Sequence, residues 1–180
     1  MRWLLLLAAL AATGARADQV VRVCYNYGCY TEDLVSYSDA RMQWVRDVLG
    51  GAATPERERE YVSLVVGRLY AWAAEQTPIG ADRGGNFADE GRPGSMDCID
   101  HSTTTDRFLR LFEAHGWLRF HRVGAIVVRH RWIVSQHFSA VLEEKASGDR
   151  YVVDSWFVNN GEPAVVMPLA AWQEGGGPDD

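Results

Sequence analysis

The sequence predicts an α+β fold in which N-terminal helices pack on a mostly antiparallel sheet. Two patterns support this prediction. Apolar residues recur at helical spacing in three segments of the first two thirds of the chain, and short runs rich in valine and aromatic residues follow. The length of 180 residues is enough for one domain with a buried core.

The composition excludes several classes of protein. A hydrophobic fraction of 47% is normal for a globular chain and argues against disorder or a collagen-like repeat. The chain has 18 basic and 24 acidic residues, which gives a net charge of −6. Because excess lysine and arginine hold nucleic-acid phosphates, this balance argues against a nucleic-acid partner.

The first 17 residues have the features of a secretory signal peptide. A positive start at Met1-Arg2 precedes an apolar run over residues 3–12, and Ala15-Arg16-Ala17 fits the A-x-A pattern of a cleavage site. An N-terminal membrane anchor is the alternative, but the run is shorter than the ~20 residues of a membrane span. We therefore expect residues 18–180 to form one mature domain, periplasmic or secreted, without membrane contact after cleavage.

In an oxidising compartment, two of the three cysteines can form a disulfide. Cys24 and Cys29 flank a short segment with a glycine, which favours a disulfide between them. Two free thiols, or a metal pair with ligands elsewhere, are the alternatives. A disulfide would leave Cys98 without a partner, either buried and inert or retained for its reactivity.

The signals for the first elements follow in order along the mature chain. Residues 19–30 are rich in valine and tyrosine and predict a strand or an extended lead-in. A first helix is expected to begin after the N-cap Ser38 and to end at Gly50-Gly51. A second helix is expected to begin at Thr54-Pro55, a capping hydroxyl followed by proline, and to extend to about Glu75.

A long segment without periodicity then precedes a third helix. Residues 76–95 are rich in glycine, and a loop of this length in a compact domain is uncommon and often functional. The third helix is expected from Cys98 to His115, with Ser95 or Asp97 as its N-cap. The strands expected after it cover residues 117–121, 123–129, 137–142, 150–157 and 164–167.

The position of Cys98 in the first turn of a helix suggests nucleophilic chemistry. Free amides and the helix dipole favour a thiolate there, and the same amides can hold an oxyanion. A cysteine nucleophile also needs a histidine and a group that orients it. His101 lies one turn along the same helix, whereas His137 leads a strand whose hairpin partner carries Asp154. The other histidines are interpreted as solvated or capping residues, namely His115, His121 and His130.

The hairpin that carries His137 and Asp154 has two possible registers. With a loop over residues 143–148 the two side chains lie directly opposite each other. With a tight turn at Ser147-Gly148, Asp154 pairs with Val141 and lies too far from His137 to bond. Both registers place His137 and Asp154 on the same face of the sheet, opposite an apolar face.

The ordered set Cys98, His137 and Asp154 resembles the papain-like and transglutaminase-like cysteine peptidase superfamily, including its exported bacterial members. The run Tyr-Val-Val-Asp-Ser-Trp over residues 151–156 is similar to the papain-type strand that ends in Asn-Ser-Trp, with aspartate in place of asparagine. The likeness spans about residues 94–157. It implies a papain-like or transglutaminase-like core.

The resemblance also implies a role for each residue. Cys98 attacks a carbonyl carbon as thiolate, His137 takes up and returns the proton, and Asp154 fixes the imidazole tautomer. The Cys98 amide would stabilise the oxyanion together with Asn86 or Gln76, which are chosen for their polarity and loop position.

The expected function is that of an exported hydrolase or acyltransferase acting on an amide or peptide bond, with hydrolysis favoured because water is abundant outside the cell. The substrate would be a peptide, a protein or a peptidoglycan-type amide, and no cofactor is implied. Asp97 and Asp100 flank Cys98 and disfavour a thiolate unless they point away.

Two other interpretations of the same residues compete with catalysis. One is a non-enzymatic periplasmic binding or assembly domain with a buried Cys98, since free cysteine is among the most buried residue types. The other is a metal site that combines Cys98, His101 and His137 with Asp97 or Asp100. That set lacks the paired spacing typical of zinc, so no metal is predicted.

Overall fold

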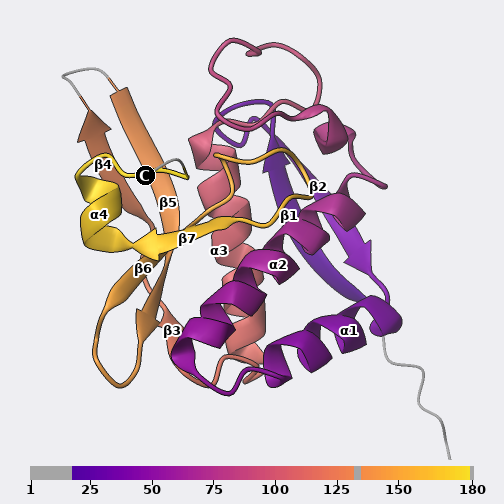
Figure 1. The fold of residues 1–180 in the computed structure, drawn as a ribbon. Coiled ribbons are helices and arrows are strands. Elements are labelled where there is room, and N and C mark those ends of the chain that lie inside the picture. The colour runs from indigo at the N-terminus through magenta and orange to yellow at the C-terminus, as the bar shows by residue number, and fades with distance from the viewer. Residues whose placement is uncertain (1–17, 132–134, 179–180) are drawn as a thin grey trace, which may run out of the picture.

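The computed structural model describes residues 18–131 and 135–178. The expected signal peptide therefore lies outside the described residues. In chain order the elements are β1 (Gln19–Tyr25), β2 (Thr31–Tyr37), α1 (Asp39–Gly50), α2 (Pro55–Ala73), the 3-10 helix η1 (Pro78–Ala81), α3 (Cys98–Ala114), β3 (His121–Val123), β4 (Val127–Arg131), β5 (Ser135–Glu144), β6 (Arg150–Asp154), β7 (Val165–Pro168) and α4 (Leu169–Gln173) (Figure 1).

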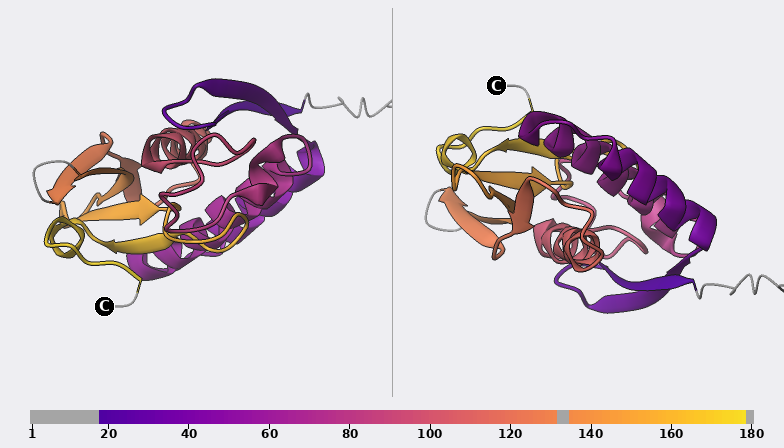
Figure 2. Two further views of the ribbon diagram at one scale, coloured as in Figure 1. Left: turned by 90° about the horizontal axis from the view of Figure 1, so that it is seen from above. Right: turned by 90° about the horizontal axis from the view of Figure 1, so that it is seen from below.

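Helix α3 lies between two antiparallel sheets, which is clear when the molecule is seen from above (Figure 2). One sheet is the β1-β2 hairpin, and the other has the strand order β3-β5-β6-β7, with β4 also paired to β5. Phe108, Leu109 and Phe112 of α3 are fully buried in the core between the layers. The α+β prediction with mostly antiparallel pairing is confirmed.

The caps predicted for the first two helices are confirmed. The Ser38 hydroxyl accepts a hydrogen bond from the Arg41 amide at 3.4 Å, and the Thr54 hydroxyl accepts one from the Arg57 amide at 3.2 Å. Proline occupies the first position of α2, where its missing N–H has no helical partner to lose. Local capping chemistry therefore defines these two starts.

The N-terminal region is a hairpin, so the expectation of a single strand before the first helix is incomplete. Strand β2 pairs with β1 in a register that places Val21 opposite Val35. Polar residues hide its strand character: Glu32 and Ser36 lie on the face opposite the buried Val35 and Tyr37, and Asp33 precedes these two on their own face. The short helix α4 is also absent from the sequence-based prediction.

The strand expected over residues 117–121 is wrong except at its last residue. The chain turns there because the buried carboxylate of Glu58 on α2 accepts hydrogen bonds from the amides of Arg119, Phe120 and His121 at 2.6 to 3.2 Å. A side chain thus takes the amides that a sheet partner would have used. Strand β6 likewise ends at Asp154, whose carboxylate accepts the amide of Trp156 at 3.1 Å.

Both registers considered for the β5-β6 hairpin are wrong. Leu142 pairs with Tyr151 and Ala140 with Val153, which is an intermediate register. If this pairing is continued by one residue, Asp154 lies across from Ser139, which is two residues along β5 from His137. The prediction that His137 and Asp154 share a face is confirmed, because all three registers have the same parity.

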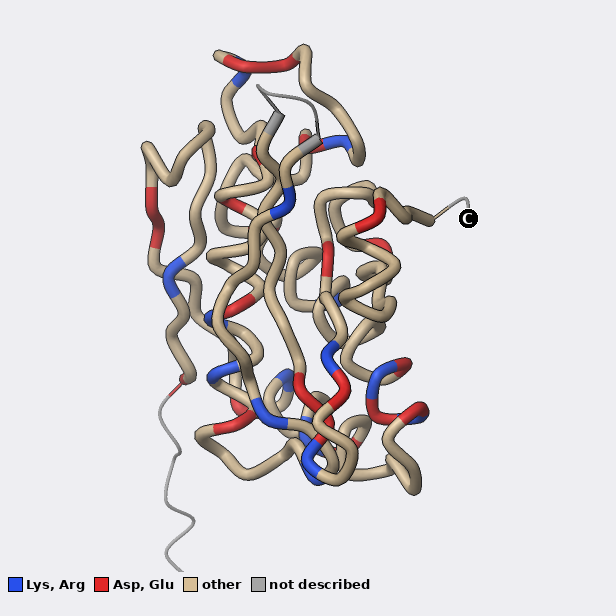
Figure 3. The backbone as a smooth tube through the Cα atoms, turned by 90° about the vertical axis from the view of Figure 1, so that its left-hand side faces the viewer, with Lys and Arg blue, Asp and Glu red and all other residues tan. Residues whose placement is uncertain are grey.

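Charged residues gather near the turn of this hairpin, where Arg122 pairs with Glu143 and Arg59 with Glu144 (Figure 3).

Candidate active site

The start of α3 carries Cys98 and is held by a disulfide-closed turn. The disulfide between Cys24 and Cys29 is present, as predicted. It closes the β1-β2 turn, in which residues 26–29 all have positive φ between 56° and 66°. Successive left-handed residues direct their amides to one side and form a concave site for anions, called a nest.

The nest binds the two carboxylates that flank Cys98. Asp100 accepts the amides of Tyr27 at 2.8 Å and Cys29 at 2.5 Å, and Asp97 accepts the amide of Gly28 at 3.0 Å. Asp97 is the N-cap of α3, since its side chain accepts the amides of Ile99 and Asp100. The two carboxylates are thus bonded to amides of the turn and of α3.

Asp100 is fully buried in this arrangement. Burial, reinforced by the charge of Asp97, raises the pKa of its carboxyl to about 6, against the opposing effect of the amide hydrogen bonds. The acidic group next to the candidate nucleophile is therefore partly protonated under mildly acidic conditions.

Cys98 is half-buried at the first residue of α3 and faces the beginning of β5. Its Sγ lies 3.8 Å from the backbone oxygen of Gln136. The next residue, His137, has its imidazole within electrostatic reach of the Cys98 side chain. The fold thus brings together two of the three residues predicted for the site.

His137 also reaches Asp154, the third predicted residue. Nε2 of His137 lies 2.7 Å from Oδ2 of Asp154, and both side chains are buried. Nδ1 of His137 is buried without a geometrically acceptable hydrogen-bond partner among the described residues. When the ring is neutral, the bond to Asp154 holds its proton on Nε2 and leaves Nδ1 as the unprotonated nitrogen.

Asp154 is oriented by an interaction that the sequence did not predict. The indole Nε1–H of Trp172 on α4 donates to Oδ2 of Asp154 at 2.9 Å. Trp172 is fully buried, and its ring centroid lies 5.6 Å from that of His137. Trp156 and Phe157 also pack against the His137 ring, at 4.8 Å and 5.3 Å between centroids. The His137–Asp154 pair therefore lies in an aromatic enclosure that restricts water.

The pKa of His137 is set by opposing effects. Burial of the ring lowers it, but the hydrogen bond and charge of Asp154, together with the Cys98 side chain, outweigh burial and raise the pKa to about 9. The ring is therefore an imidazolium at neutral pH.

The charged His137–Asp154 pair predicts a pH-dependent stability. A histidine whose pKa rises from 6.5 to about 9 on folding stabilises the fold fully below pH 6.5 and loses this contribution as pH increases through 9. We expect urea unfolding of the wild type between pH 6 and pH 9.5 to show a loss on the order of 2 to 3 kcal/mol beyond that of His137→Gln, which cannot titrate. Equal pH dependences in the two proteins would contradict a charged His137.

His101, the other histidine considered as a partner of Cys98, is bonded elsewhere. Its Nε2 lies 3.0 Å from Oδ2 of Asp82 and its Nδ1 2.8 Å from Oγ of Ser155. Ser155 continues the buried network to Thr105 and Tyr70. This network fastens α3 to the residue that follows Asp154, and so positions the two halves of the site against each other.

Three residues of the alternative metal site already have protein partners. Both ring nitrogens of His101 and the carboxylates of Asp97 and Asp100 make hydrogen bonds within the protein. Within residues 18–131 and 135–178, the one cluster of potential metal ligands is Cys24, Cys29 and Glu32. Its two cysteines form the disulfide and offer no thiolate.

The two side chains proposed for the oxyanion hole make hydrogen bonds of their own, and within the described structure only for Gln76 is the amide N–H among the bonded groups. The amide of Gln76 makes two hydrogen bonds to the backbone of Ser36 in β2, at 2.9 and 3.0 Å. Asn86 accepts the amide of Ala88 within its own loop at 2.9 Å. The third group suggested from the sequence, the Cys98 amide, belongs to the first residue of α3 and to the candidate nucleophile itself.

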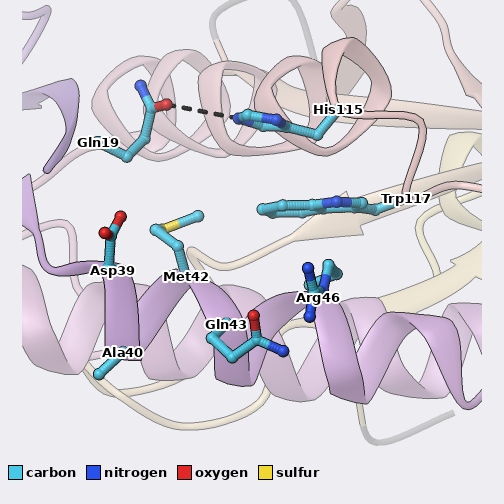
Figure 4. Close-up of a pocket in the computed structure, with 8 residues that line it drawn as sticks. All are labelled: Gln19, Asp39, Ala40, Met42, Gln43, Arg46, His115 and Trp117. Carbon is cyan, nitrogen blue, oxygen red and sulfur yellow. Dashed lines mark hydrogen bonds between the residues drawn. The ribbon is translucent and has the colours of Figure 1, made fainter. Parts of the chain in front are cut away.

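Of the remaining histidines, His130 is exposed on β4, whereas the interpretation of His121 as a solvated or capping residue is wrong. His121 is fully buried, and its Nδ1 lies 2.7 Å from Glu58. His115 stacks on Trp117 in a cavity of about 520 Å³ between α1 and the last turn of α3 (Figure 4). That cavity lies at the opposite end of α3 from Cys98 and is separate from the site.

None of the helices that the structure describes is long and apolar enough to cross a membrane. Comparisons of the chain with protein-family models, with curated proteins and with solved structures found no match, so the chemistry of this site has to be judged from its geometry.

Proposed function

We propose that this chain is an exported thiol enzyme that cleaves an amide or peptide bond through Cys98, His137 and Asp154. One observation carries the proposal. Buried His137 bonds Asp154 through Nε2, its Nδ1 has no hydrogen-bond partner in the described structure, and its imidazole is within electrostatic reach of Cys98, the cysteine outside the disulfide. A nucleophile, a base and an orienting carboxylate close together are what covalent amide cleavage requires.

The reaction follows from these positions. The Cys98 thiolate attacks the carbonyl carbon, and the amide of Cys98 at the start of α3 stabilises the oxyanion that forms. The His137 imidazolium gives its proton to the departing amine as the C–N bond breaks, which leaves a thioester. Neutral His137 then takes a proton from water, whose oxygen attacks the thioester, and the C–S bond breaks to release the acid and restore the Cys98 thiolate beside the His137 imidazolium. An amine in place of water would give acyl transfer.

The order Cys98, His137, Asp154, on a helix followed by antiparallel strands, supports a place in the papain-like or transglutaminase-like superfamily. The disulfide supports an oxidising location, periplasmic or extracellular. The competing interpretation, a binding domain with a buried Cys98, accounts less well for a thiol that is only half-buried.

Alkylation of Cys98 tests the proposal without knowledge of the substrate. At pH 6, where an ordinary thiol is protonated and slow, native Cys98 is expected to react with iodoacetamide about ten-fold or more faster than the same thiol in urea-unfolded protein. His137→Ala should abolish the difference, and His115→Ala, in the distant cavity, should retain it. A thiol that reacts only after unfolding would refute the enzyme.

A further inference from the structure

The loop between η1 and α3 is fixed against the candidate site at both sides. The amide of Gly85 donates to the backbone oxygen of Trp156 at 2.8 Å. A Cβ on Gly84 would lie 2.5 Å from the backbone oxygen of Phe157, so glycine is required for this close approach. On the other side, the buried carboxylate of Asp89 accepts the hydroxyl of Tyr27, in the disulfide-closed turn, at 2.6 Å.

These anchors present one aromatic side chain to solvent. Phe87 lies between them and is 70% exposed, although its ring centroid is only 4.5 Å from that of Trp156. Trp156 is buried and also packs against His137. A row of rings therefore leads from an exposed phenylalanine to the candidate base. The loop between η1 and α3, which carries Phe87, lies above the start of α3 (Figure 1).

An exposed phenylalanine by itself would have no special meaning. Here the loop on both sides of Phe87 is fixed in place. The close approach of Gly84 to Phe157 holds it on one side, and the hydrogen bond from Tyr27 to the buried Asp89 holds it on the other. Aromatic surfaces of this kind bind apolar groups through area burial and edge or offset ring packing. Trp156 links this surface to His137, so an apolar group bound on Phe87 would lie one ring away from the candidate base.

We propose that Phe87, supported from behind by the buried Trp156, forms a specificity wall that binds an apolar side chain, aromatic or large aliphatic, next to the amide bond that Cys98 attacks. The inference rests on the proposed function and adds the substrate class, a peptide with an apolar residue at the cleavage position. It also gives the long loop a role, because the loop supplies Phe87.

Two alkylating probes that differ only in an apolar group test the wall. The rate of Cys98 alkylation by N-benzyl iodoacetamide, divided by the rate with iodoacetamide, is expected to be about five- to ten-fold higher in native wild type than in urea-unfolded protein. In Phe87→Ala this preference should fall close to the unfolded value, and in Phe87→Leu it should be partly retained. Leu34→Ala removes another exposed apolar side chain, on β2, and should leave the ratio at the wild-type value.

The outcomes separate the two proposals. An unchanged ratio in Phe87→Ala, with rapid iodoacetamide reaction of the wild type, would overturn the wall and leave the thiol enzyme standing. A wild type that does not react with iodoacetamide in its native state would overturn both.

Discussion

Replacing Asp154 with alanine is expected to lower the free energy of unfolding by about 3 to 5 kcal/mol. The substitution removes the acceptor of three buried donors: Nε2 of His137, Nε1 of Trp172 and the amide of Trp156. Each unsatisfied buried donor costs about 1 to 3 kcal/mol, and His137 would also lose the charge that keeps it protonated. Urea unfolding at pH 7 measures the loss, and iodoacetamide reactivity of Cys98 should fall in parallel.

Two variants show whether Asp154 acts by orienting His137 or only by stabilising the fold. Asp154→Asn retains a carbonyl oxygen for the ring and the indole but removes the charge, so it should lose less stability than Asp154→Ala and keep part of the Cys98 reactivity. Asp149→Ala removes an exposed aspartate in the turn of the same hairpin and should change stability by less than about 0.5 kcal/mol. If Asp154→Ala behaved like Asp149→Ala, the carboxylate would have no role in holding His137.

Local signals were sufficient to predict the three long helices, α1, α2 and α3. Ser38, Thr54-Pro55 and Asp97 each precede a helical pattern, and each structural start coincides with the expected cap. The shared face of His137 and Asp154 was also predictable, because side-chain direction in a strand depends only on parity. The disulfide followed from close spacing once export was assumed.

Features that depend on distant contacts could not be predicted in this way. The hairpin register is fixed by the turn and by packing on α3, and neither is encoded in strand propensity. The contact from Trp172 to Asp154 joins residues 18 apart through a helix of five residues, too short to give a periodic signal. The partner of His101 is Asp82, in the loop without periodicity, where sequence reasoning had no geometry to use.

Asp100 has a structural role that its position in the sequence did not predict. Beside Cys98 in the chain, it suggested repulsion of a thiolate. In the fold its carboxylate joins the disulfide-closed turn to the start of α3 and completes a capping box with Asp97. The acid therefore positions the helix start that carries the candidate nucleophile.

Asp100→Ala is accordingly expected to cost about 3 kcal/mol of stability, because the amides of Tyr27, Cys29 and Asp97 lose their acceptor together. Native Cys98 should lose several-fold in alkylation rate as the helix start loosens, with both effects measured by urea unfolding and iodoacetamide labelling at pH 7. Asp100→Asn retains one oxygen and removes the charge that burial disfavours, and so should be much milder. Asp39→Ala is the matched control, an exposed acid in the first turn of α1.

A double-mutant cycle shows whether the disulfide acts through Asp100. Cys24→Ser with Cys29→Ser opens a short loop, for which chain entropy alone predicts a loss of about 2 kcal/mol. If the disulfide holds the nest in shape for Asp100, adding Asp100→Ala to this pair of substitutions should cost at least about 1 kcal/mol less than it does in the intact protein. Additivity within about 0.5 kcal/mol would mean that turn and helix start are independent, and that Cys98 is positioned by α3 alone.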